Sequence, residues 1–568
     1  MPRMRDNPPS IFARTFHPDE ANQAFTAGRL LETGRYEYRP DDHHGPTLYY
    51  AAAVIQKAAG HNSLATLDGT LLRCTPLLFA VLALVFGFLA VRKLLKPIMG
   101  KLGGWLVPGL FALLLGTSPI FAFFATDFIQ EMLLACFTMM MFWAGVGYFK
   151  VLGAWCLVPS EELKHKDEDE NNAPKTKLKP GTWALLFGIA AGLAFATKET
   201  SLLTFAAAGL AGVPLAWRFR KDMRRETRDV VLALAGFALT AILFYSSFAS
   251  SWQGVYNAFF AAPLSYLGRA AGSAASAGAA DHVHPWWQYL RWLFGDEYGV
   301  LAFFVLCGCG CGLFARFVWT AIRPELRARA CGPLSRTFLF TLGYALLLLA
   351  FYSLIPYKTP WCALQMHIGL LLAAVLGFAV ACGMFTAACS LPPLSGLPAE
   401  YRAYAVWLQD HPRLTKTLGT LPLAIAAVML LLANGYQIAR MSRDPDSKDI
   451  PYNYASASPE VQQLAATVAS AMASNPTIPQ SHNPPPFIAV ALPPADTWPF
   501  PWYNRPYEPQ TGYWTSFDDL KGLASTGAKP TVVIVPMTEG HLVQPLFPHL
   551  KHTKRFYMRP GVRVRVFW

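Results

Sequence analysis

Ten apolar stretches run through this sequence, and they decide what kind of fold the chain can form. A helix needs about 20 mostly apolar residues to cross the hydrocarbon core of a bilayer. The fourth and fifth stretches are short and abut at Thr197–Thr200, which predicts a tight helical hairpin. The sequence therefore predicts an α-helical polytopic membrane protein with about ten transmembrane helices, at 72–91, 103–124, 129–149, 182–197, 200–217, 229–249, 298–318, 336–356, 361–383 and 419–438.

The composition agrees with a membrane location. Apolar residues make up 53% of the chain and charged residues 15%, against roughly 25% charged residues in soluble domains. The net charge of +13 would suggest a nucleic-acid partner in a soluble protein. In a membrane protein it has another explanation, because cytoplasmic loops collect Lys and Arg. We therefore expect membrane lipid, and not nucleic acid, around this chain.

Basic residues gather in alternate loops between the apolar stretches. The positive-inside rule predicts that these loops are cytoplasmic and that the intervening loops and the tail lie outside. We therefore expect a multi-pass protein of the plasma membrane whose first loop and C-terminal tail are extracytoplasmic. The basic clusters are Arg92, Lys93, Lys96 and Lys101; Arg218, Arg220, Lys221, Arg224, Arg225 and Arg228; and Arg316, Arg323, Arg327, Arg329 and Arg336.

The first outer loop carries two adjacent carboxylates, Asp19 and Glu20, behind Pro18 and ahead of an amphipathic run to Leu31. A carboxylate beside the membrane can act as a general base toward an acceptor hydroxyl, or can hold a metal ion. An Asp that opens a helix is also a good N-cap, and a Glu in the first turn suits the helix dipole. An Asp can serve both purposes, so the two interpretations stay open.

Further ionisable residues lie on the same predicted face of the membrane. Asp127 and Glu131 are four residues apart, so on a helix they would repel each other unless a cation lay between them. Ionisable groups at membrane depth are costly and commonly functional. An ammonium group suits a phosphate, and snorkelling to lipid headgroups is the alternative. The candidates for binding the phosphate or sugar of a substrate are Asp127, Glu131, His44, Lys198, Glu199, Tyr357 and Lys358.

The tail after the last apolar stretch has a different character. Short strand-like runs occur at Phe487–Leu492, Thr531–Pro536 and Val562–Phe567, with helix-like segments at Pro459–Ala473 and Phe517–Ser525. This alternation predicts a small α/β domain.

Two smaller motifs each have a structural and a functional interpretation. The aromatic run Trp498–Tyr503 could bind sugars or lipid headgroups, although a packed proline-aromatic corner is favoured. Cys307, Cys309 and Cys311 alternate with glycine in an apolar run. Residues i and i+2 of a helix point about 200° apart, so packing of small residues against another helix is favoured over a metal site.

Several of these motifs resemble a known group of enzymes. Phe16–Glu20, His44–Tyr50 and the later turn Ala196–Thr200 are similar to the polytopic GT-C glycosyltransferases. That class includes the protein mannosyltransferase, aminoarabinose transferase and RgtA/B/C/D-like families. More closely, the Ala196–Thr200 turn, Tyr352–Trp361 and Pro451–Tyr454 resemble the "flippase activity-associated" proteins of archaeal-type glycosylation.

The resemblance implies an inverting sugar transfer from a polyprenyl phosphate on the outer face of the membrane. It implies that Asp19 is the base, that Glu20 supports it, and that Lys198 and Lys358 lie near the donor phosphate. It also implies a transmembrane helix ahead of the first loop. We expect that this helix is missing from the chain, because nothing else in the sequence would carry the basic segment Met1–Arg5 across the membrane.

We therefore expect an integral membrane glycosyltransferase in three parts: a first loop with catalytic carboxylates at 1–71, a transmembrane domain at 72–438 and an extracytoplasmic α/β domain at 439–568. The expected partners are a polyprenyl-phosphate-linked sugar and membrane lipid, and a divalent metal is compatible with the carboxylates. The alternative is a lipid-linked glycan flippase, or a flippase-associated protein, without catalytic activity. The sequence does not specify the sugar, the acceptor or the oligomeric state.

Overall fold

The computed structural model describes residues 14–40, 44–151, 178–218, 227–265, 282–295, 299–322, 326, 332–391, 399–444, 447, 449–453, 456–474 and 487–568. Asp41–His43 of the first loop and Tyr454 of the tail motif lie outside these residues. So do several residues of the predicted basic loops, at 220–225, 323, 327 and 329.

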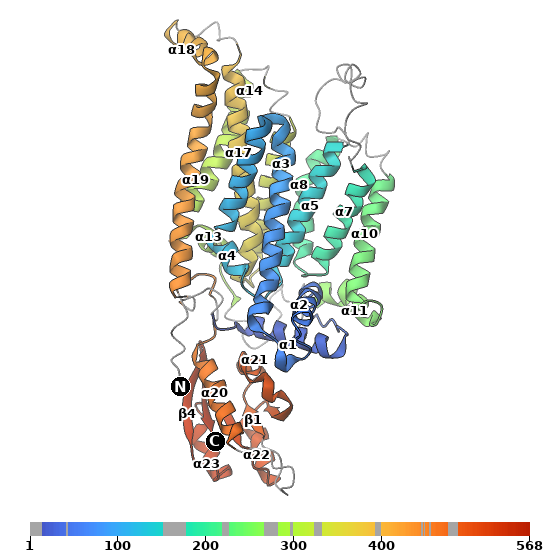
Figure 1. Cartoon of the computed structure of the whole chain (residues 1–568), viewed down its shortest axis with the longest axis vertical. Coiled ribbons are helices and arrows are strands. Elements are labelled where there is room, and N and C mark those ends of the chain that lie inside the picture. Colours follow the sequence, from blue (N-terminus) through green and yellow to red (C-terminus); the bar gives the residue numbers. More distant parts are fainter. Residues whose placement is uncertain are drawn as a thin grey trace.

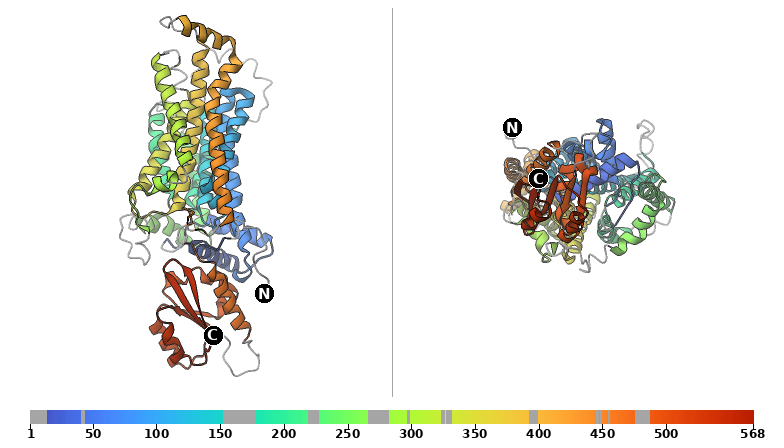
Figure 2. Two further views of the ribbon diagram at one scale, coloured as in Figure 1. Left: turned by 90° about the vertical axis from the view of Figure 1, so that its left-hand side faces the viewer. Right: turned by 90° about the horizontal axis from the view of Figure 1, so that it is seen from below.

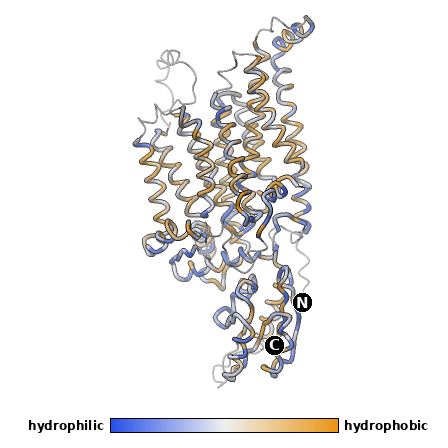
Figure 3. Tube along the Cα trace, turned by 180° about the vertical axis from the view of Figure 1, so that it is seen from behind, coloured by the Kyte–Doolittle hydropathy of each residue, from blue (hydrophilic) through white to orange (hydrophobic). Residues whose placement is uncertain are grey.

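A bundle of long apolar helices forms the body of the molecule, and a small sheet domain lies at one end of it (Figures 1 and 2). Figure 3 shows that the apolar residues concentrate in the bundle. The long helices are α3 (Gly69–Gly116), α5 (Glu131–Val151), α7 (Pro180–Phe195), α8 (Ser201–Arg218), α10 (Thr227–Tyr245), α14 (Gly299–Ile322), α16 (Pro333–Leu354), α17 (Ala363–Cys389) and α19 (Pro412–Arg443).

Seven helical segments among the described residues are long and apolar enough to cross a membrane. Three shorter apolar helices, Gly103–Gly116, Pro180–Phe195 and Ser201–Pro214, join them. Together they correspond one to one to the ten predicted stretches. The predicted α-helical polytopic membrane architecture is confirmed.

Helix α3 folds back on itself and supplies the first two of these segments. A Cβ placed on Gly87 would lie 2.8 Å from the Phe111 ring, and one on Gly116 would lie 3.2 Å from Leu84. The two halves are therefore antiparallel. The second segment ends at Gly116, and the predicted continuation to residue 124 is wrong. Ser118 is extended because it precedes Pro119, and a separate short helix, α4 (Pro119–Phe124), begins there.

The turn between α7 and α8 is short, but the predicted tight packing of these two helices is wrong. Helix α7 packs mainly on α5 and α10, whereas α8 packs on α16. Gly188 and Gly192 of α7 explain this choice. Their Cα atoms face the backbone of Ala233 and Phe237 in α10, so the close seam of α7 is with α10.

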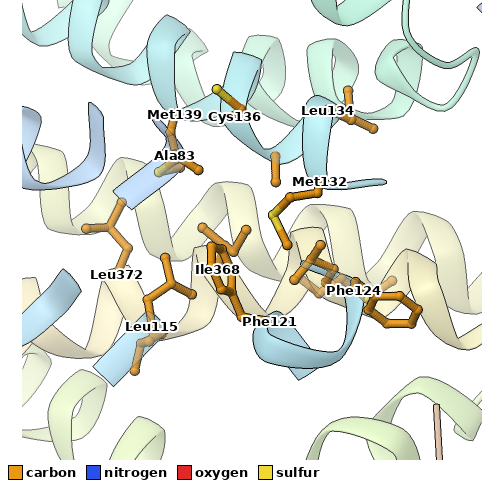
Figure 4. Packing of buried hydrophobic residues seen from close by; sticks show 14 of the residues in the cluster. Ala83, Leu115, Phe121, Phe124, Met132, Leu134, Cys136, Met139, Ile368 and Leu372 are labelled. Atoms are coloured by element: carbon orange, nitrogen blue, oxygen red, sulfur yellow. The ribbon is translucent and has the colours of Figure 1, made fainter. Parts of the chain in front are cut away.

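Helix α17 runs through the centre of the bundle and is buried along most of its length. Figure 4 shows part of the surrounding core, in which Leu115, Phe121, Met132 and Ile368 from α3, α4, α5 and α17 pack together. Helix α14 is its closest neighbour. Gly308 and Gly312 of α14 approach the backbone of Ala374 and Gly377, which supports the small-residue packing predicted from the alternating Gly and Cys residues.

Short elements lie at the end of the bundle that carries the sheet domain. They are α1 (Pro18–Thr33), α2 (Thr47–Ala58), the 3₁₀ turn η2 (Leu64–Thr66), α11 (Trp252–Tyr256) and the π-helical turn η4 (Asn257–Ala261), with α1 between the bundle and the sheet domain (Figure 1). The remaining helices outside the sheet domain are α13 (Gln288–Phe294), the 3₁₀ turn η7 (Pro360–Cys362), and α18 (Ala399–Asp410), which lies at the opposite end.

The C-terminal domain is a five-stranded mixed sheet with strand order β2-β1-β3-β5-β4. Strand β1 is parallel to β2 and β3, and β5 is antiparallel to β3 and β4. Helix α20 covers one face, and α22 and α23 cover the other. The elements are α20 (Glu460–Ala473), β1 (Ile488–Ala491), η8 (Pro494–Thr497), α21 (Phe500–Asn504), η9 (Arg505–Gln510), β2 (Thr511–Trp514), α22 (Phe517–Ser525), β3 (Val532–Pro536), η10 (Gly540–Leu542), α23 (Val543–Leu546), β4 (Thr553–Arg559) and β5 (Val562–Phe567).

The predicted α/β domain is confirmed, and its three predicted strands and two predicted helices are present. The edge strands β2 and β4 were not predicted. Strand β2 has only four residues and none of them is fully buried. Strand β4 begins with three exposed residues, so only Phe556 and Met558 carry the buried half of an alternating pattern.

A single added methyl group at Gly308 should disturb the seam between α14 and α17. Its Cβ would lie 2.6 Å from the carbonyl oxygen of Ala374, so we expect Gly308→Ala to lower the free energy of unfolding by about 1–3 kcal/mol. Gly310→Ala is the matched control, because nothing lies within 4 Å of its added Cβ. Thermal unfolding of the purified protein in detergent measures the difference, and equal unfolding temperatures would contradict the close seam.

Candidate functional site

A buried ion pair fixes the start of α1 to the first membrane-spanning helix. Glu20 is fully buried and accepts hydrogen bonds from Arg73 Nε (2.9 Å) and Nη2 (2.7 Å). It also accepts the backbone N–H groups of His17 (3.1 Å) and Phe128 (2.9 Å). All of these contacts engage the Glu20 carboxylate inside the protein, so it holds α1 in place.

The helix cap is not the one predicted. Helix α1 begins at Pro18, and its N-cap is His17, whose Nδ1 accepts the backbone N–H of Asp19 at 3.1 Å. The reciprocal contact from Glu20 to the His17 N–H completes a capping box. Asp19 therefore lies inside the first turn, and its side chain is left out of the cap.

Asp19 differs from every other predicted carboxylate of this region in its exposure. Its side chain is 50% exposed, and His17 Nδ1 lies 3.9 Å from its carboxylate. That nitrogen also accepts a hydrogen bond from the Asp19 backbone N–H. Asp19 thus presents an ionisable oxygen to solvent at the N-terminus of α1.

Asp127 and Glu131 do not share a helix face, which corrects the prediction. Asp127 precedes α5 and accepts a hydrogen bond from Arg14 Nη2 at 3.2 Å, while Glu131 is the first residue of α5 and pairs with Lys198. Each carboxylate has a cation of its own. Their repulsion is relieved because the chain bends between them.

Burial and neighbouring charges move the carboxyl pKa values in opposite directions. Burial favours the neutral form of Glu20, but Arg73 and Arg14 outweigh it and lower its pKa to about 2. The pKa of Asp127 is raised, because burial and the nearby negative charge of Glu20 exceed the help from its arginine neighbours. Glu20 is therefore the anion that balances Arg73.

Lys198 is a buried cation in the turn between α7 and α8. Its ammonium pairs with Glu131, and the Trp361 ring lies 5.9 Å away. Burial alone would lower the pKa of Lys198, but Glu131 raises it above its usual value. The charge of Lys198 is therefore kept and matched by a carboxylate.

Glu199, the next residue, belongs to a separate cluster. It accepts hydrogen bonds from the Tyr38 hydroxyl (2.5 Å) and from His44 Nδ1 (2.9 Å). Burial would raise the pKa of Glu199, and the partly exposed His44 lowers it. This cluster ties the first loop to the α7–α8 turn, because Thr47 N–H also donates to the Ala196 carbonyl at 3.2 Å.

Lys358 is buried without a carboxylate partner among the described residues. Its ammonium donates to the backbone carbonyls of His284 (3.3 Å) and Ile355. The loop around it pairs with residues 282–284, since Lys358 N–H donates to the His282 carbonyl at 2.8 Å. Burial lowers the pKa of Lys358. Tyr357 points outward, is 39% exposed and stacks on His282.

Trp361 lies between the two charged clusters nearest the bundle. Its ring meets His17 edge-on at 5.9 Å and lies the same distance from the Lys198 ammonium. A narrow cleft at this point is lined by residues of the first loop, the α4–α5 turn and the tail, namely Arg14, Thr15, His17, Phe123, Asp127, Ile129, Trp361, Tyr452, Asn453 and Ser456. Asp127 is thus the one predicted site residue in its wall, and Asp19 adjoins it through His17.

The predicted residues therefore collect at one end of the bundle, in neighbouring clusters rather than in a single pocket. Sequence reasoning missed Arg14, Arg73, Tyr38 and Trp361 as their partners. Arg73 had a usable signal, because an arginine at the start of an apolar stretch is costly unless a carboxylate neutralises it. Among the described residues, no group of three or more His, Cys, Asp or Glu side chains could hold a metal ion.

Comparisons with known proteins bear on the fold. No protein-family model and no curated protein matches this sequence. Among solved structures, ArnT from Cupriavidus metallidurans bound to undecaprenyl phosphate matches at 16% identity with a TM-score of 0.56, over 98% of this chain and 95% of ArnT. The apo state of ArnT gives 15% identity and a TM-score of 0.55, over 98% and 94%. AglB, an archaeal oligosaccharyltransferase from Archaeoglobus fulgidus, gives 12% identity and 0.48, over 94% and 67%.

The two ArnT structures define the fold of this chain. ArnT is an aminoarabinose transferase of the GT-C class, and the match extends over nearly the whole of both chains. The protein therefore has the GT-C fold, as the sequence resemblance predicts.

Removing the charge of Glu20 should destabilise the protein, because Arg73 would then be buried without a counter-charge. We expect Glu20→Gln to lower the free energy of unfolding by about 3–5 kcal/mol. Asp19→Asn, one residue earlier, should change it by less than about 0.5 kcal/mol, since that side chain is half exposed. Thermal unfolding in detergent at pH 7 measures both.

The difference in stability between the native protein and Glu20→Gln should depend on pH. The folded-state pKa of Glu20, about 2, lies below its ordinary value of 4.5, so the ion pair stabilises the protein fully above pH 4.5. That contribution is lost as the pH falls through the folded-state pKa. The gap in unfolding temperature between the native protein and Glu20→Gln should therefore narrow from pH 4.5 toward pH 2. A constant gap over this range would contradict the ion pair.

Proposed function

We propose that this protein is an integral membrane glycosyltransferase that transfers a sugar from a polyprenyl-phosphate-linked donor to an acceptor hydroxyl on the outer face of the membrane. The observation that carries the proposal is the contrast among the carboxylates of the site. Glu20, Asp127, Glu131 and Glu199 are buried and engaged by Arg, Lys or His side chains, whereas Asp19 is half exposed. Asp19 is therefore the carboxylate that is free to take a proton from an acceptor.

Lys358 supports the second half of the proposal, which is an anionic leaving group. A buried ammonium that meets only two backbone carbonyls is not electrically balanced. A phosphate would balance it, because three ammonium donors can meet phosphate oxygens. Lys358 lies three residues before Trp361, whose ring contacts His17, so the candidate phosphate site and Asp19 are joined through one loop.

The reaction follows from these two groups. Asp19 accepts the proton of the acceptor hydroxyl as its oxygen attacks the anomeric carbon of the sugar. The bond between that carbon and the phosphate oxygen breaks, and its electron pair leaves with the polyprenyl phosphate. Lys358 stabilises the charge that develops on the phosphate. Attack opposite to the leaving group inverts the anomeric centre.

The remaining predicted residues have supporting roles in this proposal. Lys198 and Glu131 hold Trp361 beside the N-terminus of α1, and His44 and Glu199 hold the first loop against the α7–α8 turn. Glu20 positions Asp19 through the helix cap. The exposed Tyr357 ring lies at the surface beside Lys358, where it could stack on a sugar.

The fold lends weight to a lipid-linked donor. The matching ArnT structure contains undecaprenyl phosphate, which is a polyprenyl phosphate. The candidate residues here lie at one end of the apolar bundle, where a lipid phosphate would meet the membrane surface (Figure 1). The basic residues Arg92, Lys93 and Lys96 lie at the other end of the bundle, near the point where α3 folds back. Their positive charge favours a cytoplasmic location for that other end.

Asp19→Asn should abolish transfer without loss of fold. We expect consumption of a polyprenyl-phosphate-linked hexose or pentose to fall about 10²–10⁴-fold, measured in proteoliposomes supplied with membrane extract as the source of acceptor. Glu37→Gln is the control, since Glu37 is an exposed carboxylate of the same loop. Unchanged turnover in Asp19→Asn would overturn the assignment. Movement of the lipid-linked sugar across the bilayer without its consumption would instead favour the flippase alternative.

Lys358→Gln should weaken binding of the lipid phosphate. Loss of the charged partner is expected to raise the Kd for polyprenyl phosphate about 10–100-fold, because no other unmatched ammonium is present in the described loop at 355–362. The exposed Lys57 of α2 provides the control variant, Lys57→Gln. Binding of a fluorescent polyprenyl phosphate to the purified protein measures both, and equal affinities would contradict the phosphate site.

A further inference from the structure

Four side chains from the membrane domain and the C-terminal domain stack in one column. The Arg73 guanidinium lies 4.4 Å over the Phe16 ring, Phe16 stacks on Trp502 with ring centroids 4.7 Å apart, and the Arg505 guanidinium lies 3.9 Å over Trp502. Phe16 belongs to the first loop and Arg73 to the membrane domain, whereas Trp502 and Arg505 belong to the sheet domain. The order of the column is therefore cation, ring, ring, cation, with a domain boundary at its centre.

A hydrogen bond accompanies this column at the same place. The backbone N–H of Phe16 donates to the Tyr503 hydroxyl at 2.8 Å. Tyr503 follows Trp502 directly in α21. The C-terminal domain therefore holds both the side chain and the backbone of a residue only three positions before Asp19.

Two further contacts join the sheet domain to α1 and to the end of the first loop. The Trp498 ring meets Phe25 of α1 edge-on at 5.5 Å, and Arg505 Nη2 donates to the Leu67 carbonyl at 2.8 Å. Gly69, the first residue of α3, lies against Phe16 and Trp502. The aromatic run Trp498–Tyr503 is thus a packed corner whose partners are the first loop and α1.

We propose that the C-terminal domain is a positioning element for Asp19, with Tyr503 and Trp502 as the positioning residues. The proposal rests on the function proposed for Asp19. The segment Arg14–His17 precedes α1 and runs into the cap that orients the first turn of that helix. The contacts of Arg73 and Trp502 with the Phe16 ring fix the position from which Asp19 projects.

Geometry of this kind acts on turnover more than on donor binding. A base displaced by about 1 Å from its acceptor can cost as much as 10²-fold in rate, whereas the proposed phosphate site at Lys358 makes no contact with Tyr503 or Trp502 in the described structure. Loss of the clamp should therefore lower kcat and leave the KM for the lipid-linked donor unchanged. A residue needed only for folding would not produce this split.

Tyr503→Phe tests the hydrogen bond with the smallest possible change. In the full-length protein in detergent, we expect faster deuterium exchange of the backbone amides in Arg14–Asp19 and a kcat about 10-fold lower at unchanged donor KM. Tyr513→Phe is the matched control, because it makes the same change on strand β2, away from the contacts with α1. It should leave both measurements unaltered.

Two variants at Trp502 distinguish the effect of ring stacking from the effect of side-chain volume. Trp502→Phe keeps a ring against Phe16 and should retain most of kcat, whereas Trp502→Leu should lose about 10-fold. Unaltered exchange at Arg14–Asp19 in Tyr503→Phe would overturn the inference, and so would faster exchange at unchanged kcat. If the native protein transfers no sugar from any polyprenyl phosphate, the proposed function fails, and the exchange measurement still decides whether the domain orders this loop.

Discussion

The packing of the first loop against the helix bundle depends on one buried ion pair, between Arg73 and Glu20. Arg73 lies near the start of α3, the first membrane-spanning helix of the described chain, and its guanidinium is buried. A buried cation is tolerable only with a well-placed anion, and Glu20 supplies it with two parallel hydrogen bonds. The same carboxylate accepts from Phe128 ahead of α5 and from the cap of α1. One pair of opposite charges therefore joins the first loop to two helices.

Three other candidate carboxylates at this end of the bundle are matched in the same way. Asp127 meets Arg14, Glu131 meets Lys198, and Glu199 meets His44. Among the described candidate residues with charged side chains, the half-exposed Asp19 and the ammonium of Lys358 differ from these pairs. In the proposed function, these two groups are the ones that meet the acceptor hydroxyl and the lipid phosphate.

The sequence was sufficient for the architecture and for the grouping of the candidate residues at one end of the bundle, but not for the pairing of their charges. The membrane helices could be predicted because about 20 apolar residues in a row have few other uses. The grouping of candidates at one end followed from the alternation of basic loops. Which carboxylate is free could not be predicted, because Arg14, Arg73 and Tyr503 reach Asp127, Glu20 and Phe16 across sequence separations that no local pattern encodes. The sequence predicts Asp19 as the N-cap of α1, whereas the structure has His17 in that position. The capping box between His17 and Glu20 starts the helix at Pro18, and so places Asp19 in its first turn.

The divergence of α7 and α8 has a mechanical consequence. Helix α7 belongs to a group with α5 and α10, and α8 belongs to a group with α16 and, through it, α17. The two groups are joined in the chain by the five residues at 196–200, among them Lys198 and Glu199. The Lys198–Glu131 ion pair ties that turn back to α5. A displacement of one helix group against the other would therefore strain this ion pair, and with it the position of the Lys198 ammonium beside Trp361.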